Sequence, residues 1–425
     1  MNAQAGERLN VFLNGDRVGE IERRGPSRYR FAYAPATLQA HRADEVVLSA
    51  SLPLQSEPFP PSATAPFFEG LLPEGGVRSA IARSFHISEE DGFGLLRVLG
   101  ADCAGAVAVL PPEVEPVPPG RGALRPLSRR QLEQLVDDLP RNPLGVDAGE
   151  EGVRLSLGGI QHKLVLAGSV ARGFSQPLDG APSTCLLKPE FGQYTELVAN
   201  ELFCMKVVGT SGARAAFVDA IDIGSVRALY VERFDRAADA AGNVTRVHQE
   251  DMCQALGVSP VAKYEDNGGP SVAGIVELLR RLRGPYMARD INDFVHAVLI
   301  NFLLGNSDAH GKNFALLYEP GSGPRLAPLY DVVSTAVYPD LTKQMAMAIG
   351  GVADPAKVDM EAWARLAEEC HLSRGIAPIV RRRTAALLRA VADRREAAIR
   401  DGWHSEVIDA IVDLCRGRAA QLLES

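Results

Sequence analysis

The chain lacks the cysteine pattern of a zinc site or of a disulfide framework. Its six cysteines are scattered, with no C-x-x-C pair among them, so neither a zinc site nor a disulfide framework is expected. A basic excess is missing too. With 45 Lys and Arg against 53 Asp and Glu, the formal net charge is −8, which argues against nucleic-acid binding through the chain's own surface.

Long hydrophobic runs are also absent. No stretch reaches the length that crosses a bilayer, and the first residues are polar, without the apolar core of a signal peptide. The 425 residues are 46% hydrophobic and 23% charged, which is ordinary for a globular protein of two or three domains. We therefore expect a reduced, cytoplasmic protein.

The most informative stretch is SDAHGKN at positions 307–313. It follows an apolar segment, Asp293 to Leu304, that predicts a buried helix ended by Gly305. Asp308 and Asn313 have the D-x-x-x-x-N spacing of a kinase catalytic loop, in which the Asp takes a hydroxyl proton and the Asn holds magnesium. Asp331 stands downstream where a second, carboxylate ligand would be. The alternative is a surface loop whose Asp and Asn only cap turns.

The first 110 residues predict a small α/β module without catalytic residues. A hairpin is expected over Leu9 to Ile21 because Asn14-Gly15 is a typical hairpin turn. The other predictions are a strand through Tyr29 to Tyr33, a non-helical proline-rich connector from Pro58 to Pro66, a helix from Val77 to Phe85 and a strand from Ala106 to Leu110. Packing or docking is the default role of such a module.

The next segment has the parts of a nucleotide site. A linker (Pro111 to Pro126) and a helix (Ser128 to Leu139) precede a glycine hairpin, Arg154 to Lys163. Its Gly158 and Gly159 can bring backbone amides close to an anion, although most such hairpins are only hairpins. Lys188 ends the apolar strand Thr184 to Leu187, as a phosphate-binding lysine would or as a lysine reaching to solvent would.

The later chain becomes helical. A strand over Ala228 to Arg236 could offer backbone groups to an adenine edge, or it could be an edge strand with Arg233 and Asp235 as a surface pair. His248 to Gln254 reads as the start of a helix, and Lys263 to Pro270 as a polar Gly-Gly loop. Helices are expected at 271–283, 290–304, 361–370, 376–400 and 405–423.

The sequences of these segments resemble those of the HipA serine/threonine kinases, the toxins of bacterial toxin–antitoxin pairs. The matching pieces span most of the chain: VFLNGDRVGE (Val11 to Glu20), FFEGLLPEG (Phe67 to Gly75), SLGGIQHK (Ser156 to Lys163), LLKP (Leu186 to Pro189), VERFDR (Val231 to Arg236), QEDMCQALG (Gln249 to Gly257), KYEDNGGP (Lys263 to Pro270), DAHGKNF (Asp308 to Phe314) and LYDVVS (Leu329 to Ser334). The order of parts, from glycine hairpin to late Asp, is also that of a kinase.

This resemblance implies an α+β, two-lobed kinase-like fold, closer to lipid kinases than to typical protein kinases, with a helical C-terminal lobe. The implied domains are 1–110, the linker and helix at 111–150, a nucleotide-binding lobe at 151–255 and a catalytic lobe at 256–425. The resemblance makes Asp308 the proton acceptor, Asn313 and Asp331 the Mg²⁺ ligands, and Ser156 an inactivating autophosphorylation site. ATP contacts are implied for Gly158, Gly159, Ile160, Gln161, His162, Lys163, Lys188, Glu232, Arg233, Phe234, His310, Gly311, Lys312, Asn313, Tyr330 and Asp331.

The resemblance also implies partners. They are a small helix-turn-helix antitoxin that carries the operator recognition, so that DNA is reached only indirectly, and an aminoacyl-tRNA synthetase substrate. Glutamyl-tRNA synthetase comes first among these, and its phosphorylation would arrest translation and growth and give persistence. His162 departs from the family wording, which puts the loop's substrate contacts in doubt. Two other hypotheses stay open: a kinase of this fold acting on a small molecule or lipid headgroup, and an inactive co-repressor scaffold.

Overall fold

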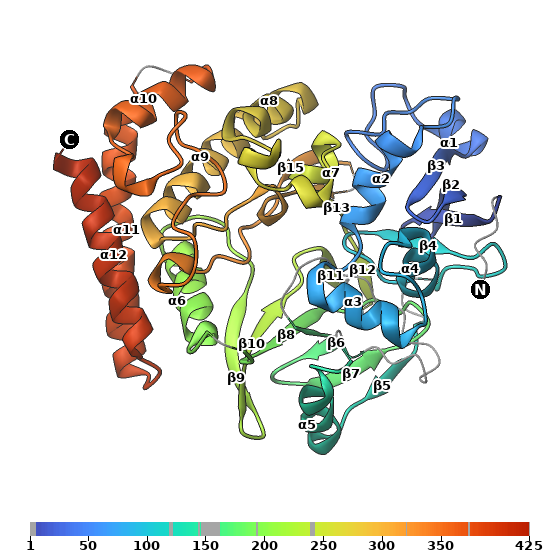
Figure 1. Ribbon diagram of the computed structural model, residues 1–425, viewed down its shortest axis with the longest axis horizontal. Coiled ribbons are helices and arrows are strands. Elements are labelled where there is room, and N and C mark those ends of the chain that lie inside the picture. Colours follow the sequence, from blue (N-terminus) through green and yellow to red (C-terminus); the bar gives the residue numbers. More distant parts are fainter. Residues whose placement is uncertain are drawn as a thin grey trace. The chain divides into compact units, whose positions relative to one another are not determined.

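The computed structural model describes residues 6–118, 122–142, 145, 162–192, 194–238, 243–319, 321–372 and 375–424. The chain divides into two compact units. Unit 1 comprises Met1–Pro189, Ile221–Pro260 and Leu317–Gly321, and unit 2 comprises Glu190–Ala220, Val261–Leu316 and Ser322–Ser425. The fold is α+β, with sheets and helices in unit 1 and helices dominating unit 2 (Figure 1).

Unit 1 begins with an antiparallel sheet in the order β3-β2-β1-β4. Asn14 and Gly15 join the first two strands with φ values of +52° and +92°, as the predicted hairpin turn requires. Buried aromatic and aliphatic side chains from this sheet and its helices form one core. The elements are β1 (Arg8–Leu13), β2 (Asp16–Gly25), β3 (Arg28–Tyr33), β4 (Val107–Leu110), α1 (Pro35–Ala40), α2 (Pro61–Gly70), α3 (Gly75–Ser84) and α4 (Gly92–Leu99).

The expectation of a non-helical connector at Pro58 to Pro66 is wrong, because α2 begins at Pro61. Proline suits the first helical position, where its missing N–H would have no partner in any case. Pro66 lies inside the helix and is tolerated there. The next two residues, Phe67 and Phe68, are fully buried, and their burial offsets the lost backbone hydrogen bond.

A second sheet, which belongs to unit 1 apart from the first residues of β9, has the order β5-β7-β6-β8-β10-β9. The first strand corrects the linker prediction, since the last three residues of Pro111 to Pro126 pair with β7 at the sheet edge. The predicted helix follows, capped by Ser128 as expected. The elements are β5 (Leu124–Pro126), α5 (Arg129–Asp138), β6 (Leu164–Ser169), β7 (Gly173–Pro177), β8 (Cys185–Pro189), β9 (Val218–Ile223) and β10 (Val226–Glu232).

Short elements complete unit 1. The pair β11 (Arg236–Ala238) and β12 (Val244–Arg246) is followed by β13 (His248–Asp251) and α7 (Met252–Leu256). The expected helix start at His248 is therefore four residues early. Asp251 is the N-cap of the helix, because its side chain accepts the Gln254 N–H and forms a capping box.

Unit 2 is built on long helices, and α11 and α12 lie alongside each other (Figure 1). Their bounds agree closely with the five predicted helices: α8 (Val272–Leu282), α9 (Met287–Leu304), α10 (Met360–Glu369), α11 (Ile376–Arg400) and α12 (Glu406–Glu424), with α6 (Leu197–Thr210) before them. The strands β14 (Ala315–Glu319) and β15 (Gly323–Leu326) lie where the chain leaves unit 2 and returns to it.

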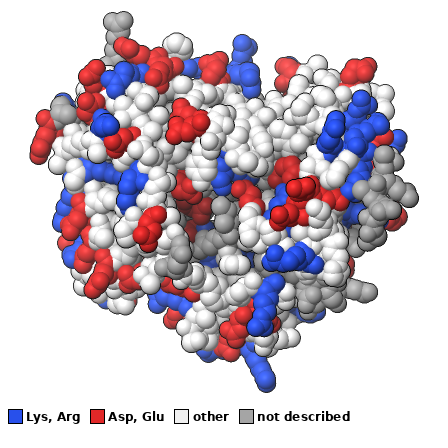
Figure 2. All heavy atoms as spheres, viewed as in Figure 1, with Lys and Arg blue, Asp and Glu red and all other residues white. Residues whose placement is uncertain are grey.

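On the face drawn in Figure 2, acidic and basic side chains are mixed, in small groups of either sign. All six cysteines are buried, and none of them forms a disulfide. Among the described residues, no helix has the length and apolarity needed to cross a membrane.

Candidate active site

The loop after α9 is carried by a rigid helix end. Leu303 and Leu304 are fully buried, and Gly305 ends the helix with φ +78°, as the sequence predicts. A Cβ at this glycine would lie 2.9 Å from Ser334 Oγ. Both the left-handed backbone and the crowding therefore require glycine here, and the polar loop starts from a fixed point.

Hydrogen bonds within the loop fix the position of Asp308. Its backbone N–H donates to Asn306 Oδ1 at 3.2 Å, and its carbonyl accepts the N–H of His310 at 2.8 Å. The side chain stays 52% exposed. The backbone is thus held while the carboxylate remains accessible, which is the arrangement that a proton acceptor needs.

Asn313 and Asp331 meet in unit 2, although 18 residues separate them. Asn313 Nδ2 donates to Asp331 Oδ2 at 3.1 Å, and Asn313 Oδ1 accepts the His310 N–H at 3.1 Å. Asp331 has φ +59°, a left-handed conformation that Asp and Asn adopt more readily than most residues. Such local strain is typical of functional positions.

The remaining predicted residues of unit 2 surround this pair. Gly311, Lys312 and Asn313 form a short 3-10 turn. The Tyr330 hydroxyl donates to the Lys312 carbonyl at 2.7 Å, which ties the segment before Asp331 to the loop. His310 is 6% exposed. Unit 2 therefore brings together all of the site residues predicted from Asp308 onward.

Unit 1 holds the other predicted nucleotide residues. Lys188 is 7% exposed on β8, opposite Leu229 of β10, and Lys163 is 7% exposed just before β6. His162 is half-buried beside it. Ser156, Gly158, Gly159, Ile160 and Gln161 lie outside the described residues.

The segment after β10 corrects one alternative. Arg233 and Asp235 do not form a surface pair at a sheet edge, because they are 7% and 2% exposed and β10 lies between β8 and β9. The Arg233 guanidinium donates to Asp235 at 2.7 and 2.9 Å, and its backbone N–H donates to Thr184 O at 3.0 Å. The Arg233 side chain is thus structural, whereas Glu232 is exposed and Phe234 half-buried.

Sequence reasoning missed the buried acid that completes this cluster. Asp102 is fully buried and accepts from Ser183, Arg236 and Arg246, with Arg236 at 2.9 Å. Burial raises the pKa of Asp102, but Arg236, Arg233 and Arg246 outweigh it and hold the pKa below its usual range. No local sequence pattern predicts the ion pairs of Asp102, since Arg236 and Arg246 lie more than 130 residues away along the chain.

Sequence reasoning also assigned no role to Tyr264, whose hydroxyl donates to Asp308 Oδ1 at 2.7 Å. The signal was available, because Tyr264 lies in the KYEDNGGP stretch that the sequence singles out. The stretch contains several polar and charged residues, and its sequence does not indicate which of them contacts the catalytic loop.

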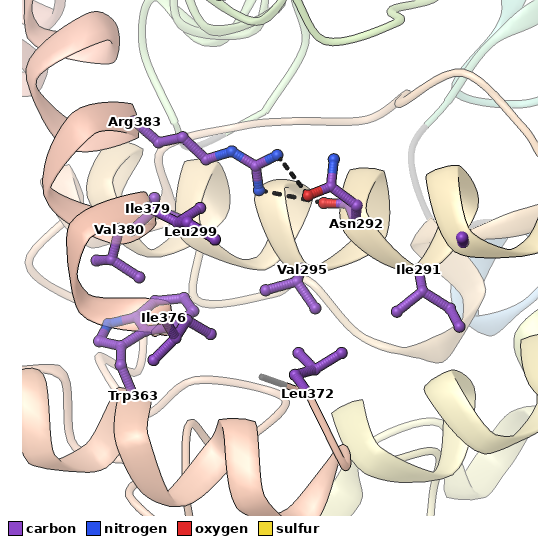
Figure 3. A pocket seen from close by; sticks show the side chains of 11 residues that line it. Ile291, Asn292, Val295, Leu299, Trp363, Leu372, Ile376, Ile379, Val380 and Arg383 are labelled. Carbon is purple, nitrogen blue, oxygen red and sulfur yellow. Dashed lines mark hydrogen bonds between the residues drawn. The ribbon is translucent and has the colours of Figure 1, made fainter. Parts of the chain in front are cut away.

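A cavity of about 180 Å³ lies elsewhere in unit 2, between α9, α10 and α11. Figure 3 shows Arg383 of α11 reaching Asn292 of α9, where it donates to Oδ1 at 2.9 Å. The other walls, Val295 and Trp363 among them, are mostly apolar. None of the predicted site residues lines this cavity.

Comparisons with known proteins agree with the motifs. The family model described as the HipA-like C-terminal domain matches residues 155–399, and the HipA N-terminal domain matches residues 9–110. The chain is 39% identical over 396 residues to Y4mE of Sinorhizobium fredii, covering 92% of each chain. It is 35% identical over 309 residues to the serine/threonine-protein kinase toxin HipA of Shewanella oneidensis, covering 69% of this chain and 68% of that one.

A solved structure extends this likeness to the fold. In the complex of HipA, HipB and operator DNA from Shewanella oneidensis MR-1, a chain 28% identical in sequence superposes with a TM-score of 0.79. The match covers 98% of this chain and 97% of that one. The expected fold class is confirmed, and the chain belongs to the HipA family of serine/threonine protein kinases.

Proposed function

We propose that unit 2 transfers the γ-phosphoryl group of ATP to a protein serine or threonine, with Asp308 as proton acceptor and Asn313 and Asp331 as magnesium ligands. The observation that carries these roles is the 3.1 Å contact between Asn313 and Asp331, in the same unit as the half-exposed Asp308. Phosphoryl transfer needs these groups: an oxygen near the nucleophile and oxygen ligands for a hard cation.

The donor set fits Mg²⁺. An amide and a carboxylate converge, and a carbonyl oxygen such as Asn313 Oδ1 has a second lone pair besides the one that accepts the His310 N–H. Magnesium commonly takes one or two protein ligands and completes its shell with water and substrate phosphates. Consistent with this, no cluster of three or more His, Cys, Asp and Glu side chains suited to a metal occurs in the part of the chain that the structure describes. When bound, the ion would neutralise phosphate charge.

The nucleotide contacts are assigned by resemblance to the family. Lys188 would pair with ATP phosphates, and the loop from Gly158 to Lys163 would cover them. The backbone of Glu232, Arg233 and Phe234 would meet adenine, while His310, Gly311, Lys312 and Tyr330 would border the nucleotide. Because the Arg233 side chain is buried against Asp235 and its backbone N–H donates to Thr184 O, its proposed contact is through its carbonyl oxygen.

We infer that the partner is a small helix-turn-helix antitoxin and that DNA is reached only through it. The solved HipA of Shewanella oneidensis is held with HipB and operator DNA. The net charge of −8 gives this chain no excess of basic charge with which to hold a phosphate backbone. In this proposal residues 1–110 form a docking module, residues 111–150 the linker and helix, residues 151–255 the nucleotide lobe and residues 256–425 the catalytic lobe of a cytoplasmic protein.

Ser156 is the proposed autophosphorylation site. A phosphate there would add close to two negative charges beside Gly158 and Gly159, whose amides are assigned to ATP phosphates. Self-phosphorylation should therefore switch the kinase off. Phosphopeptide mapping after prolonged incubation with Mg·ATP tests this, and a self-labelled chain with unmodified Ser156 would remove the idea.

The proposed substrate is an aminoacyl-tRNA synthetase, with glutamyl-tRNA synthetase first. The test is expression of the chain without its antitoxin and comparison of the phosphoproteome with that of Asp308→Asn. Growth arrest with a new synthetase phosphate is expected only for the active form. If growth stops without such a phosphate, the synthetase assignment fails. Equal effects of both forms would favour the non-catalytic scaffold.

A further inference from the structure

The loop Lys263 to Pro270 has no part in the proposed function, yet it reaches the catalytic carboxylate. The Tyr264 hydroxyl donates to Asp308 Oδ1 at 2.7 Å. Among the described residues, no other side chain forms a hydrogen bond with that carboxylate. The second oxygen, Oδ2, lies 4.0 Å from His310 Nε2. One oxygen of Asp308 is thus engaged by the phenol, and the side chain as a whole remains half exposed.

The loop holds Tyr264 from both sides. The Lys263 carbonyl accepts the Gly311 N–H at 3.3 Å, and the Glu265 N–H donates to Ala346 O at 3.0 Å. The tyrosine ring also packs edge-on against the buried His310 ring, with centroids 5.2 Å apart and planes at 83°. A side chain held at its backbone, its ring and its hydroxyl is a fixed part of the site rather than a movable plug.

The two glycines of the loop explain how it closes. The Gly269 N–H donates to the Tyr264 carbonyl at 2.9 Å. A Cβ at position 269 would lie 2.6 Å from that carbonyl oxygen and 2.3 Å from Ala262 O, closer than a side chain can approach. Gly268 has φ +84°, which favours glycine. The Gly-Gly pair therefore allows the turn that fixes the tyrosine backbone.

We propose that Tyr264 is a positioning residue for Asp308. Its hydroxyl holds Oδ1 so that Oδ2 is presented to the acceptor hydroxyl. In the transfer step the acceptor oxygen bonds to the γ-phosphorus, the bond from phosphorus to the β–γ bridging oxygen breaks, ADP leaves, and the acceptor proton passes to Oδ2. The phenol keeps its own proton throughout. This inference rests on the proposed role of Asp308 as proton acceptor.

The test is Tyr264→Phe, which keeps the ring packing on His310 and removes only the hydroxyl. The initial rate of transfer from γ-labelled Mg·ATP to the chain itself should fall by roughly 10- to 100-fold, the scale of losing a reacting geometry. The dissociation constant for a fluorescent ATP analogue should stay within about twofold, because catalysis and nucleotide binding separate here.

A matched control is Tyr338→Phe. This tyrosine also belongs to unit 2 and is 9% exposed, and its hydroxyl donates to Thr195 O at 3.1 Å, away from Asp308. Its loss should lower the melting temperature and leave the transfer rate unchanged. In addition, the double variant Tyr264→Phe with Asp308→Asn should be no slower than Asp308→Asn alone, since a positioning residue acts through the group it positions.

The outcomes separate cleanly. A wild-type rate in Tyr264→Phe overturns the inference. A faster rate overturns it in favour of a hydroxyl that competes with substrate, and a rate loss matched by weaker nucleotide binding overturns it in favour of a binding role. A wild-type chain that binds Mg·ATP but transfers no phosphate overturns the proposed function itself, and the tyrosine role falls with it.

Discussion

Asp308 and Asp102 are both aspartates, but their surroundings are opposite. Asp102 in unit 1 is fully buried and is held by Ser183 and by the guanidinium groups of Arg236 and Arg246. Asp308 in unit 2 is half exposed, and among the described residues its carboxylate accepts a side-chain hydrogen bond from Tyr264 alone. The first carboxylate has its charge fully compensated and serves the fold. The second retains an oxygen for chemistry, so the number and burial of the partners distinguish the two roles.

The largest effect on stability is expected from a substitution at the buried Asp102. Asp102→Asn keeps the shape but removes the negative charge that Arg236 and Arg246 share, which leaves Arg236 with Asp235 at 3.0 Å. Removing one partner of a buried ion pair costs about 3–5 kcal/mol, so the melting temperature should fall sharply. The control is Glu22→Gln, which breaks the exposed pair of Glu22 with Arg24 and should cost no more than about 1 kcal/mol. Equal melting temperatures of the two variants would contradict this reading.

A substitution in the exposed candidate site should instead lower the rate of phosphoryl transfer. Asp331→Asn removes a charged ligand, while asparagine tolerates the left-handed backbone at φ +59°. Phosphoryl transfer should fall by roughly 100- to 1,000-fold, the scale of losing one group that stabilises transition-state charge. The melting temperature should stay near that of the wild type. Transfer rates measured over a Mg²⁺ titration check this, and an unchanged magnesium requirement would remove Asp331 from the metal site.

Glu250 is also a buried acid, but none of the described Lys, Arg and His side chains forms an ion pair with it. Burial raises its pKa to about 7, although Ser49, Tyr318 and Ala50 donate hydrogen bonds to it. Between the ordinary pKa of 4.5 and about 7, the folded state binds more protons than the unfolded state. Stability contributed by the protonated form is therefore present below pH 4.5 and is lost as pH rises through 7, by about 3 kcal/mol at most.

Glu250→Gln should remove this contribution to the pH dependence of stability, since glutamine does not titrate. Asp102 has the opposite sign: its lowered pKa gives stability above the ordinary range of an aspartate, which is lost as pH falls through the lowered value. Urea unfolding of the wild type and of Glu250→Gln at several pH values between 4.5 and 8 measures the contribution of Glu250, whereas Asp102 titrates below this range. The same slope in Glu250→Gln as in the wild type would contradict the assignment.

The smallest effect is expected away from both carboxylates. Val295→Phe places a larger apolar side chain toward the cavity of about 180 Å³ between α9, α10 and α11 (Figure 3). Filling such a space commonly adds about 0.5–2 kcal/mol. The transfer rate should not change, because none of the proposed catalytic residues lines the cavity. A large loss of transfer would show that this region is coupled to the site.

Local patterns predicted much of the fold. The helix over 376–400 coincides with α11, Gly305 ends α9, and Asn14-Gly15 turns the first hairpin. The same patterns failed at Pro61, where proline begins a helix instead of preventing one. Periodicity and turn chemistry are local, so they succeed wherever neighbours in sequence decide the conformation.

The candidate site divides in the same way. The spacing of Asp308 and Asn313 lies within one loop and can be read directly from the sequence. The contact of Tyr264 with Asp308 spans 44 residues, and that of Arg236 with Asp102 spans 134. Such pairs depend on tertiary packing, which is why the tyrosine went unassigned and why Arg233 and Asp235 were open to interpretation as a surface pair.

The central claim is that Asp308 accepts the proton in phosphoryl transfer. The most direct measurement compares wild type and Asp308→Asn at saturating Mg·ATP, following γ-labelled phosphate on the chain and nucleotide binding in the same samples. Asparagine keeps the side-chain shape but removes the base, so transfer should be lost while nucleotide binding and melting temperature stay those of the wild type. Undiminished labelling of the Asp308→Asn protein would contradict the claim.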